Sequence, residues 1–330
     1  MTIGTHNGKF HTDEALACFF LKSIPEFSNA EIVRSRNMEI LKKIDILVDV
    51  GGVYNHEKRR YDHHQKTFEE TMASLKVLPS FNTKLSSAGL IYAHYGKRII
   101  SEILNISPND SSMDDLFYFM YLFFVESVDA IDNGVNCYDC PPKYIVPESL
   151  SSRVNDLMPY WNSTKSNDED YLYEQFMKAI KLVGTSFTNK LESTYYSWLP
   201  AKNIVKEALE KRFLVHSTGQ IIYLDKGSVP WKSQLLILEK ELCLNEKDIS
   251  FVVYKDEINN RYKVQAIPLK NEDMAFENRA LLKKEWRGLD REKLKELSKI
   301  NDIEFVHVSG FIGGANSLES VIEMAVRSLN

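Results

Sequence analysis

Cysteine is scarce in this sequence, and apolar runs of membrane-spanning length are absent from it. The chain holds four cysteines among 330 residues. Cys137 and Cys140 form a C-x-x-C, but the second pair that would complete a four-thiolate zinc site is missing. Because Pro141 and Pro142 follow, where a redox-active C-x-x-C starts a helix, we expect a loop with two free thiols. The densest apolar run, 116–125, suits a buried helix and is too short to span a bilayer.

Positive charge is in deficit too. Lys and Arg number 41 against 46 Asp and Glu, which gives a formal net charge of -5. Proteins that grip long duplex DNA usually carry a basic surface. The balance disfavours such a role and leaves a small anionic substrate, or a short single strand held in a local basic groove.

The chain runs almost directly into a polar motif at His6. We therefore expect no signal or transit sequence, a location in the cytoplasm or the nucleus, and no membrane partner. Hydrophobic residues make up 44% and charged residues 26%, which is typical of a globular protein with enough apolar material for a core in each half. The oligomeric state stays open.

Changes of pattern predict three parts. Strand and helix candidates alternate through residues 1–147, which predicts an α/β domain with a parallel sheet, helices on both faces and a site at the carboxyl ends of the strands. Residues 148–210 are expected to form a helical connector, and residues 211–330 a smaller C-terminal α/β domain, with a cleft between the domains. We expect helices near 14–21, 86–95, 113–130, 191–199, 232–241, 290–299 and 317–328, and a further helix that begins at 168–171. We expect strands near 31–34, 44–50, 213–216, 220–224, 249–254, 262–267 and 304–308.

Histidines gather at the start of the chain, and the first of them stand beside carboxylates. Six of the eight lie in the first 94 residues. His6, His11 and Asp13 come just before a helix, and imidazole with carboxylate favours manganese, cobalt or zinc over calcium. Taken alone, a polar helix cap at Thr12 or Asp13 explains this motif equally well.

Two further elements carry the same chemistry. Asp49 ends the apolar strand 44–50, where parallel sheets place functional groups, although an Asp before a Gly-Gly pair is also a common turn. In Asp62-His63-His64, one imidazole can bind a metal while the other faces substrate, and Asp62 can orient a ring nitrogen. In isolation, a surface histidine pair in a charged loop would explain this motif.

Asp129 and Asp132 lie three residues apart and share one helix face. Asp129 follows a long apolar helix that must be buried, whereas Asp132 lies near Gly134 and is explained by an ordinary helix C-terminus. We expect Asp129 at the metal and keep Asp132 as the reserve.

Together these elements resemble the DHH phosphoesterase superfamily in order and rough spacing. It includes RecJ-type exonucleases, nanoRNases, cyclic-dinucleotide phosphodiesterases and family II inorganic pyrophosphatases. The motif sequences resemble those of the Myg (melanocyte-proliferating-gene) family more closely still. This family is also labelled UPF0160 and metal-dependent protein hydrolase, and a eukaryotic member is regarded as a 3′→5′ RNA exonuclease. The motifs cover nearly the whole chain: Thr5-His-Asn-Gly-Lys-Phe-His-Thr-Asp-Glu-Ala, Asp49-Val-Gly-Gly-Val-Tyr, Arg60-Tyr-Asp-His-His-Gln, Ser86-Ser-Ala-Gly-Leu-Ile, Ala130-Ile-Asp-Asn-Gly, Trp286-Arg-Gly-Leu and Gly310-Phe-Ile-Gly-Gly-Ala.

The resemblance implies a role for each matched residue. His11 stands where the superfamily has an Asp, which leaves the identity of the metal open. Asp49 would be the bridging carboxylate, His63, supported by Asp62, would bind the second metal, and His64 would face the phosphate. The metal ligands expected are His6, His11, Asp13, Asp49, His63 and Asp129. The catalytic residues expected beside them are His64, Asp62, Lys9 and Arg60.

A glycine-rich motif precedes the last helix candidate. Glycines there let backbone N–H groups approach an anion, although Gly-Gly turns are frequent, and DHH proteins carry a glycine-rich substrate loop in this region. Arg287 would add a phosphate contact, with a surface arginine as the alternative, and Trp231 would stack a base. The substrate-binding residues expected are Arg287, Gly310, Gly313, Gly314 and Asn316.

These observations predict a metal-dependent phosphodiesterase in which two divalent cations activate a water that attacks phosphorus in line. Manganese is the first expectation, with magnesium, cobalt or zinc as alternatives. The arrangement suits exonuclease action on short single strands, and the resemblance implies 3′–5′ polarity with single-stranded RNA or another nucleotide as substrate. The alternatives are a pyrophosphatase or a cyclic-dinucleotide or nanoRNA phosphodiesterase, a non-catalytic binding scaffold, and, with least support, a protein hydrolase. The resemblance leaves mitochondrial import open, although we see no presequence.

Overall fold

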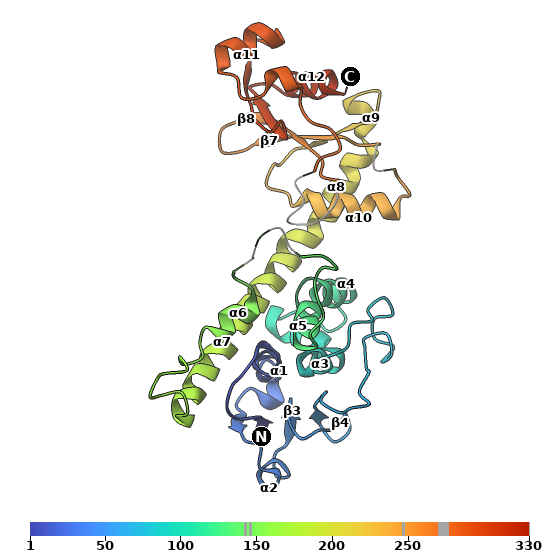
Figure 1. The fold of residues 1–330 in the computed structure, drawn as a ribbon. Coiled ribbons are helices and arrows are strands. Elements are labelled where there is room, and N and C mark those ends of the chain that lie inside the picture. The colour runs from blue at the N-terminus through green and yellow to red at the C-terminus, as the bar shows by residue number, and fades with distance from the viewer. Residues whose placement is uncertain (142–143, 145–146, 246–247, 270–276, 330) are drawn as a thin grey trace. The chain divides into compact units, whose positions relative to one another are not determined.

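The computed structural model describes residues 1–141, 144, 147–245, 248–269 and 277–329. The chain forms two compact units, residues 1–195 and 196–330 (Figure 1). The expected boundaries at 147 and 211 differ from this division, because the long helix after residue 168 packs on the first helix of the first unit. None of the helices in the described parts of the chain combines the length and apolar character needed to cross a membrane.

The first unit is built on a five-stranded sheet in the order β2-β1-β3-β5-β4. Strands β2, β1, β3 and β5 run parallel to one another, and β4 at the edge is antiparallel to β5. The predicted parallel core is therefore confirmed. Every residue of β3 is buried and is valine, isoleucine or leucine, as in a strand covered on both faces. The strands are β1 (Thr2–Thr5), β2 (Glu31–Arg34), β3 (Ile46–Val48), β4 (Tyr54–Asn55) and β5 (Arg60–Tyr61).

Helices make up most of the rest of the first unit. The prediction of one helix over 113–130 is confirmed in outline, but its middle turn is a π-helix, 121–125. Helix α7 packs on α1 and α6. The helices are α1 (Thr12–Lys22), η1 (Pro25–Phe27), α2 (Met38–Leu41), α3 (Ser87–Leu104), α4 (Met113–Met120), η2 (Tyr121–Val125), α5 (Glu126–Asp132), α6 (Leu150–Asn155) and α7 (Glu169–Ser193).

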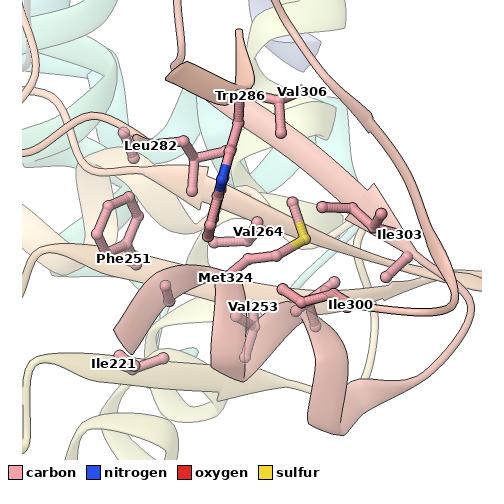
Figure 2. Packing of buried hydrophobic residues seen from close by; sticks show 14 of the residues in the cluster. Ile221, Phe251, Val253, Val264, Leu282, Trp286, Ile300, Ile303, Val306 and Met324 are labelled. Atoms are coloured by element: carbon pink, nitrogen blue, oxygen red, sulfur yellow. The ribbon is translucent and has the colours of Figure 1, made fainter. Parts of the chain in front are cut away.

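The second unit holds a mixed sheet in the order β6-β7-β8-β10-β9, in which only β6 and β7 pair in parallel. Helix α12 and the segments around β9 bury one core against it, in which Trp286 and Met324 lie in the middle and Phe251 at one side (Figure 2). The elements are η3 (Thr194–Trp198), α8 (Leu199–Glu210), α9 (Arg212–Val215), β6 (Ile221–Leu224), α10 (Trp231–Glu241), β7 (Phe251–Asp256), β8 (Arg261–Ala266), η4 (Lys284–Trp286), α11 (Arg291–Ser298), β9 (Ile303–Val306), β10 (Ile312–Ala315) and α12 (Leu318–Ser328).

Two predictions for the second unit are wrong in secondary structure. The expected strand 213–216 is the short helix α9, in which the His216 N–H donates to the carbonyl of Arg212 and the Leu214 side chain is 85% exposed. Gly313 and Gly314 of the glycine-rich motif lie in strand β10 rather than in a loop, and Gly310 lies in the turn before it. A Cβ on Gly313 would lie 2.7 Å from the Met324 side chain and 3.0 Å from a backbone carbonyl, so close packing requires this glycine.

Candidate metal centre

The parallel strands of the first unit end in polar side chains at one edge of the sheet. His6 follows β1, Asp49 follows β3 and Asp62 follows β5. These three residues line one pocket of about 660 Å³, within the usual size range of small-molecule sites. The other lining residues are Phe10, His11, Thr12, Asp13, Arg36, Val50, Gly51, Gly52, His64, Val128, Ile131, Asp132, Ser151 and Asn155.

Asp49 has an unusual backbone. Its φ of 56° lies in the left-handed region, which costs a residue other than glycine roughly 1–2 kcal/mol. Its N–H is held by the carbonyl of Tyr61 on the neighbouring strand. Such conformations persist where the surroundings impose them and cluster at functional sites. Here the turn places the carboxylate among histidines.

The Asp49 carboxylate lies among three histidines. Its Oδ1 is 3.3 Å from His64 Nδ1, and Asp49, His63 and His64 form one group of possible metal donors. Oδ2 is 3.3 Å from His6 Nε2, and Oδ1 is 3.5 Å from His63 Nε2. Burial opposes its charge, but His6 and His63 hold the pKa of Asp49 well below its ordinary value. This arrangement suits a carboxylate that serves two neighbouring positions, as the resemblance implied.

His6, His11 and Glu14 form one group of donors around the His6 side of Asp49. His6 Nδ1 lies 3.1 Å from the Asn7 carbonyl, to which only a protonated nitrogen can donate, so Nε2 faces the centre. Glu14 Oε1 lies 3.1 Å from His6 Nε2 and accepts the His11 N–H at 2.8 Å. Burial disfavours a charged His6, yet the Asp49 and Glu14 carboxylates outweigh it and raise its pKa to about 10.

Asp13, His63 and Asp132 form a second group. His63 Nε2 lies 3.0 Å from Asp132 Oδ2. Burial again opposes the charge, but the contacts with Asp132 and Asp49 raise the pKa of His63 to about 11. Burial, with Asp132 and Asp49 nearby, raises the pKa of Asp13 well above its ordinary value. The cluster thus buries more carboxylate than the histidines can neutralise.

Asp129, which we expected at the metal, lies outside these groups among the described residues. Its Oδ1 accepts the Ser86 N–H at 2.9 Å and the Ser86 hydroxyl at 2.7 Å, and its Oδ2 accepts the Tyr121 hydroxyl at 2.8 Å. The structure instead places the reserve residue, Asp132, against His63. Burial raises the pKa of Asp129 to about 7.

The N-terminus of α3 holds the Asp13 carboxylate in place through backbone N–H groups. Asp13 accepts the Ser87 N–H at 3.1 Å and the Ala88 N–H at 2.5 Å, and Asp129 holds the capping residue Ser86. Two carboxylates thus pair with buried N–H groups at the start of this helix that have no partner within the helix, and they favour its dipole. A Cβ on Gly89 would lie 2.2 Å from Asp129 Oδ1, which explains the glycine in this motif.

Asp62 and His64 form the pocket wall beside Asp49. Asp62 accepts the N–H groups of Gly52 at 2.5 Å and of His64 at 3.0 Å, and its Oδ1 lies 2.8 Å from His64 Nδ1. That hydrogen bond raises the pKa of His64 despite partial burial. The His64 side chain is 63% exposed, so its free nitrogen can meet a ligand in the pocket.

The two basic residues that we expected at the site are not brought to it. Arg60 donates to the carbonyls of Ile44 at 3.0 Å and Asp45 at 3.3 Å, beside the start of β3 and away from its carboxyl end. Lys9 is exposed and is not among the residues that line the pocket. For these two residues the expectation of a catalytic role is not supported by their positions.

In the second unit, the residues expected to bind substrate have structural contacts. Arg287 donates from Nε to the Leu282 carbonyl at 2.8 Å and packs on Gly310. Asn316 donates to Glu304 at 2.8 Å. Gly314, like its neighbour in β10, packs closely, here on the Phe305 ring. Trp231, expected to stack a base, is 4% exposed and belongs to a hydrophobic core.

The donor set fits a cation. Glu14 Oε2, Asp49 Oδ1 and His63 Nε2 are buried and make no hydrogen bond to any described residue. Buried polar atoms are rarely left in this state unless a ligand or water completes them. Imidazole nitrogens with carboxylate oxygens suit manganese, cobalt or zinc. Cations would replace the protons that otherwise neutralise the carboxylates.

Sequence reasoning missed several site residues. Glu14 is not among the expected site residues, although its place close to His6 and His11 in the sequence is a usable signal. Arg36, Ser151 and Asn155 also line the pocket, and nothing in their local sequence pointed to it. The C-x-x-C cysteines are exposed and free, as expected.

Fold and site together define a class: an α/β protein with a histidine and aspartate centre at the carboxyl edge of a parallel sheet. A family model, MYG1_exonuc, described as Uncharacterised protein family (UPF0160), matches residues 2–329. The chain belongs to this family, and the predicted family membership is confirmed.

Similar proteins are found in several animals. The MYG1 exonuclease of Mus musculus is 46% identical over 328 residues, which cover 99% of this chain and 84% of the mouse protein. The MYG1 protein of Caenorhabditis elegans is 45% identical over 330 residues, which cover 99% and 94%. Among solved structures, a pGpG-specific phosphodiesterase from Vibrio cholerae matches with 10% identity, 99% and 96% coverage and a TM-score of 0.26. A score this low carries no argument.

Proposed function

We propose that the chain is a metal-dependent phosphodiesterase that removes nucleotides from the 3′ end of short single-stranded RNA. The position of Asp49 between His6 and His63, with one carboxylate oxygen near each, is the observation that carries the proposal. A relative named an exonuclease supports the same reaction class.

Two groups of residues would hold the cations, with Asp49 between them. His6, His11 and Glu14 would bind one, and Asp13, His63 and Asp132 the other. When bound, two such cations activate a water and stabilise the oxygens that enter and leave phosphorus. Asp129 would act indirectly, through Ser86 and the start of α3. Manganese suits this mixed donor set.

His64 would provide the protein's own proton chemistry. Asp62 accepts from Nδ1 and favours the protonated ring, whose Nε2–H would donate to a phosphate oxygen in the pocket. In the reaction, the water oxygen bonds to phosphorus and the bond from phosphorus to O3′ breaks. The O3′ atom takes a proton, and the products are a nucleoside 5′-monophosphate and a chain shorter by one nucleotide.

Asp49→Ala and His63→Ala test the proposal. Each should lower manganese-dependent release of nucleotides from a labelled RNA oligomer by at least about 100-fold, because each removes a donor from the centre. Asp45→Ala is the matched control, an exposed carboxylate near the other end of β3. Undiminished release by Asp49→Ala would rule out this centre.

The substrate panel separates the alternatives. Hydrolysis of pyrophosphate or a cyclic dinucleotide without release from RNA would make the chain a different phosphoesterase. The chain would be a non-catalytic binding scaffold if it bound RNA but hydrolysed none of these substrates with manganese, magnesium, cobalt or zinc.

A further inference from the structure

The metal pocket has a cationic corner that the proposed mechanism does not use. Arg36 is the one lysine or arginine among the described residues that line the pocket. It follows β2, as His6 follows β1 and Asp49 follows β3, so it belongs to the same carboxyl edge of the sheet. Its side chain is exposed, and no hydrogen bond or ion pair joins it to another described residue.

Arg34, two residues earlier, shows the contrast. Its guanidinium donates to the carbonyls of His6 at 3.2 Å and Gly8 at 2.8 Å and lies 4.6 Å from the centre of the Phe176 ring. The guanidinium of Arg34 is thus occupied by the loop after β1, whereas that of Arg36 is free to bind a ligand. A planar guanidinium binds phosphate oxygens with two hydrogen bonds.

Helix α6 lines the same pocket with polar groups. Ser151 and Asn155 lie four residues apart, so they share one face of the helix, and both line the pocket. The helix is fixed by Val154, which is 1% exposed, and by the Thr12 hydroxyl, 3.3 Å from that of Ser151. The Asn155 side chain is exposed and has no partner among the described residues.

We propose that Arg36 and Asn155 form the part of the substrate site that does not depend on the cations. Arg36 binds a phosphate oxygen of the nucleotide, and Asn155 hydrogen-bonds a sugar hydroxyl, so the pocket favours ribonucleotides over deoxyribonucleotides. The half-exposed Ile131, which also lines the pocket, offers an apolar surface for the sugar or base. The inference rests on the proposed function, whose substrate it specifies.

The test compares Arg36→Gln, Arg36→Lys and Asn155→Ala in the manganese-loaded full chain. Arg36→Gln should lower kcat/KM roughly 10- to 100-fold on RNA and DNA oligomers alike, as expected for a lost charged hydrogen bond, and Arg36→Lys should recover part of it. Asn155→Ala should lower kcat/KM about 3- to 10-fold on RNA and leave DNA unchanged. Arg153→Gln, an exposed arginine on the same helix that does not line the pocket, is the matched control.

Calorimetric titration with adenosine 5′-monophosphate and its 2′-deoxy analogue gives a readout apart from turnover. Arg36→Gln should weaken both ligands, and Asn155→Ala only the ribonucleotide. Wild-type values for Arg36→Gln in both assays would overturn the inference and leave the exonuclease proposal standing. Arg36-dependent binding of the nucleotide by a chain that cleaves no oligomer would support the inference and reject the exonuclease. Equal losses on RNA and DNA in Asn155→Ala would overturn the sugar contact.

Discussion

Both units bury charged side chains, but they leave them in different states. In the second unit, Arg279 and Glu239 form a two-bond ion pair at 2.7 Å each, with side chains 3% and 5% exposed, and Arg279 also donates to the Ile249 carbonyl. In the first unit, Asp49 and His63 keep buried atoms without a hydrogen bond to any described residue. Arg279 Nε is also buried without a hydrogen bond, but in this closed pair each charge meets its opposite, whereas unpaired carboxylate and imidazole atoms that face one another indicate a place for a ligand.

The largest effect is expected from opening the closed pair. Glu239→Gln leaves the Arg279 charge buried without its partner and should lower the free energy of unfolding by roughly 3–5 kcal/mol. Urea denaturation measures it. Manganese affinity should not change, because the pair is not part of the metal centre.

The control for this prediction lies on the same helix. Glu241 pairs with Lys202 at 2.7 Å, but its side chain is 48% exposed. Glu241→Gln should cost at most about 1 kcal/mol. If Glu239→Gln costs as little, the buried pair is not the stabilising contact that the comparison assumes.

The second effect concerns the two aspartates of α5. Asp132→Asn should weaken manganese binding at least about 10- to 100-fold, since it removes a donor beside His63. Asp129→Asn should instead lower the free energy of unfolding by about 1–3 kcal/mol, because it disturbs buried hydrogen bonds to Ser86 and Tyr121. Calorimetry with manganese and urea denaturation separate the two outcomes. If Asp129→Asn lost more manganese affinity than Asp132→Asn, Asp129 rather than Asp132 would be the metal ligand.

The smallest effect is expected at His94, a half-buried histidine of the first unit that does not belong to the centre. His94 stacks on His56 at 3.8 Å and is hydrogen-bonded to Tyr54, away from the pocket. Burial, and the positive charge of His56, lower its pKa from 6.5 to about 4. The folded state therefore favours the neutral ring, which stabilises the protein fully above pH 6.5 and progressively less as the pH falls towards 4.

His94→Gln should remove this contribution. The difference in unfolding free energy between wild type and variant, measured in a chelator at pH 7 and pH 5, should be smaller at pH 5. A difference that does not change with pH would mean that His94 does not titrate in this range.

The sequence could predict the centre because its donors follow strands with clear patterns. The apolar run before Asp49 and the Asp-His-His motif are local signals, and parallel pairing brings them to one edge. The choice between Asp129 and Asp132 is not local. The π-helical turn at 121–125 rotates the helix relative to an ordinary α-helical count, so periodicity alone cannot tell which of the two reaches His63.

Pairing within a sheet explains the other difference. The glycines at 313 and 314 have the composition of an anion loop, but they lie in β10 between two neighbours, β8 and β9. Their small size serves the approach of Met324 and Phe305. Only the partners across the sheet reveal that need, and a single sequence does not name them.

Arg34 links the loop after β1, which carries His6, to helix α7, which supplies no metal donor. Its guanidinium lies against Phe176 of α7 while it holds the carbonyls of His6 and Gly8, and Glu169, at the start of the same helix, accepts from Asn7 at 3.2 Å. The spacing of the first donor group is therefore set partly by a brace outside the sheet. A bend in α7 would therefore shift the loop that carries His6 and change the distance from His6 to Asp49, without any substitution in the pocket itself.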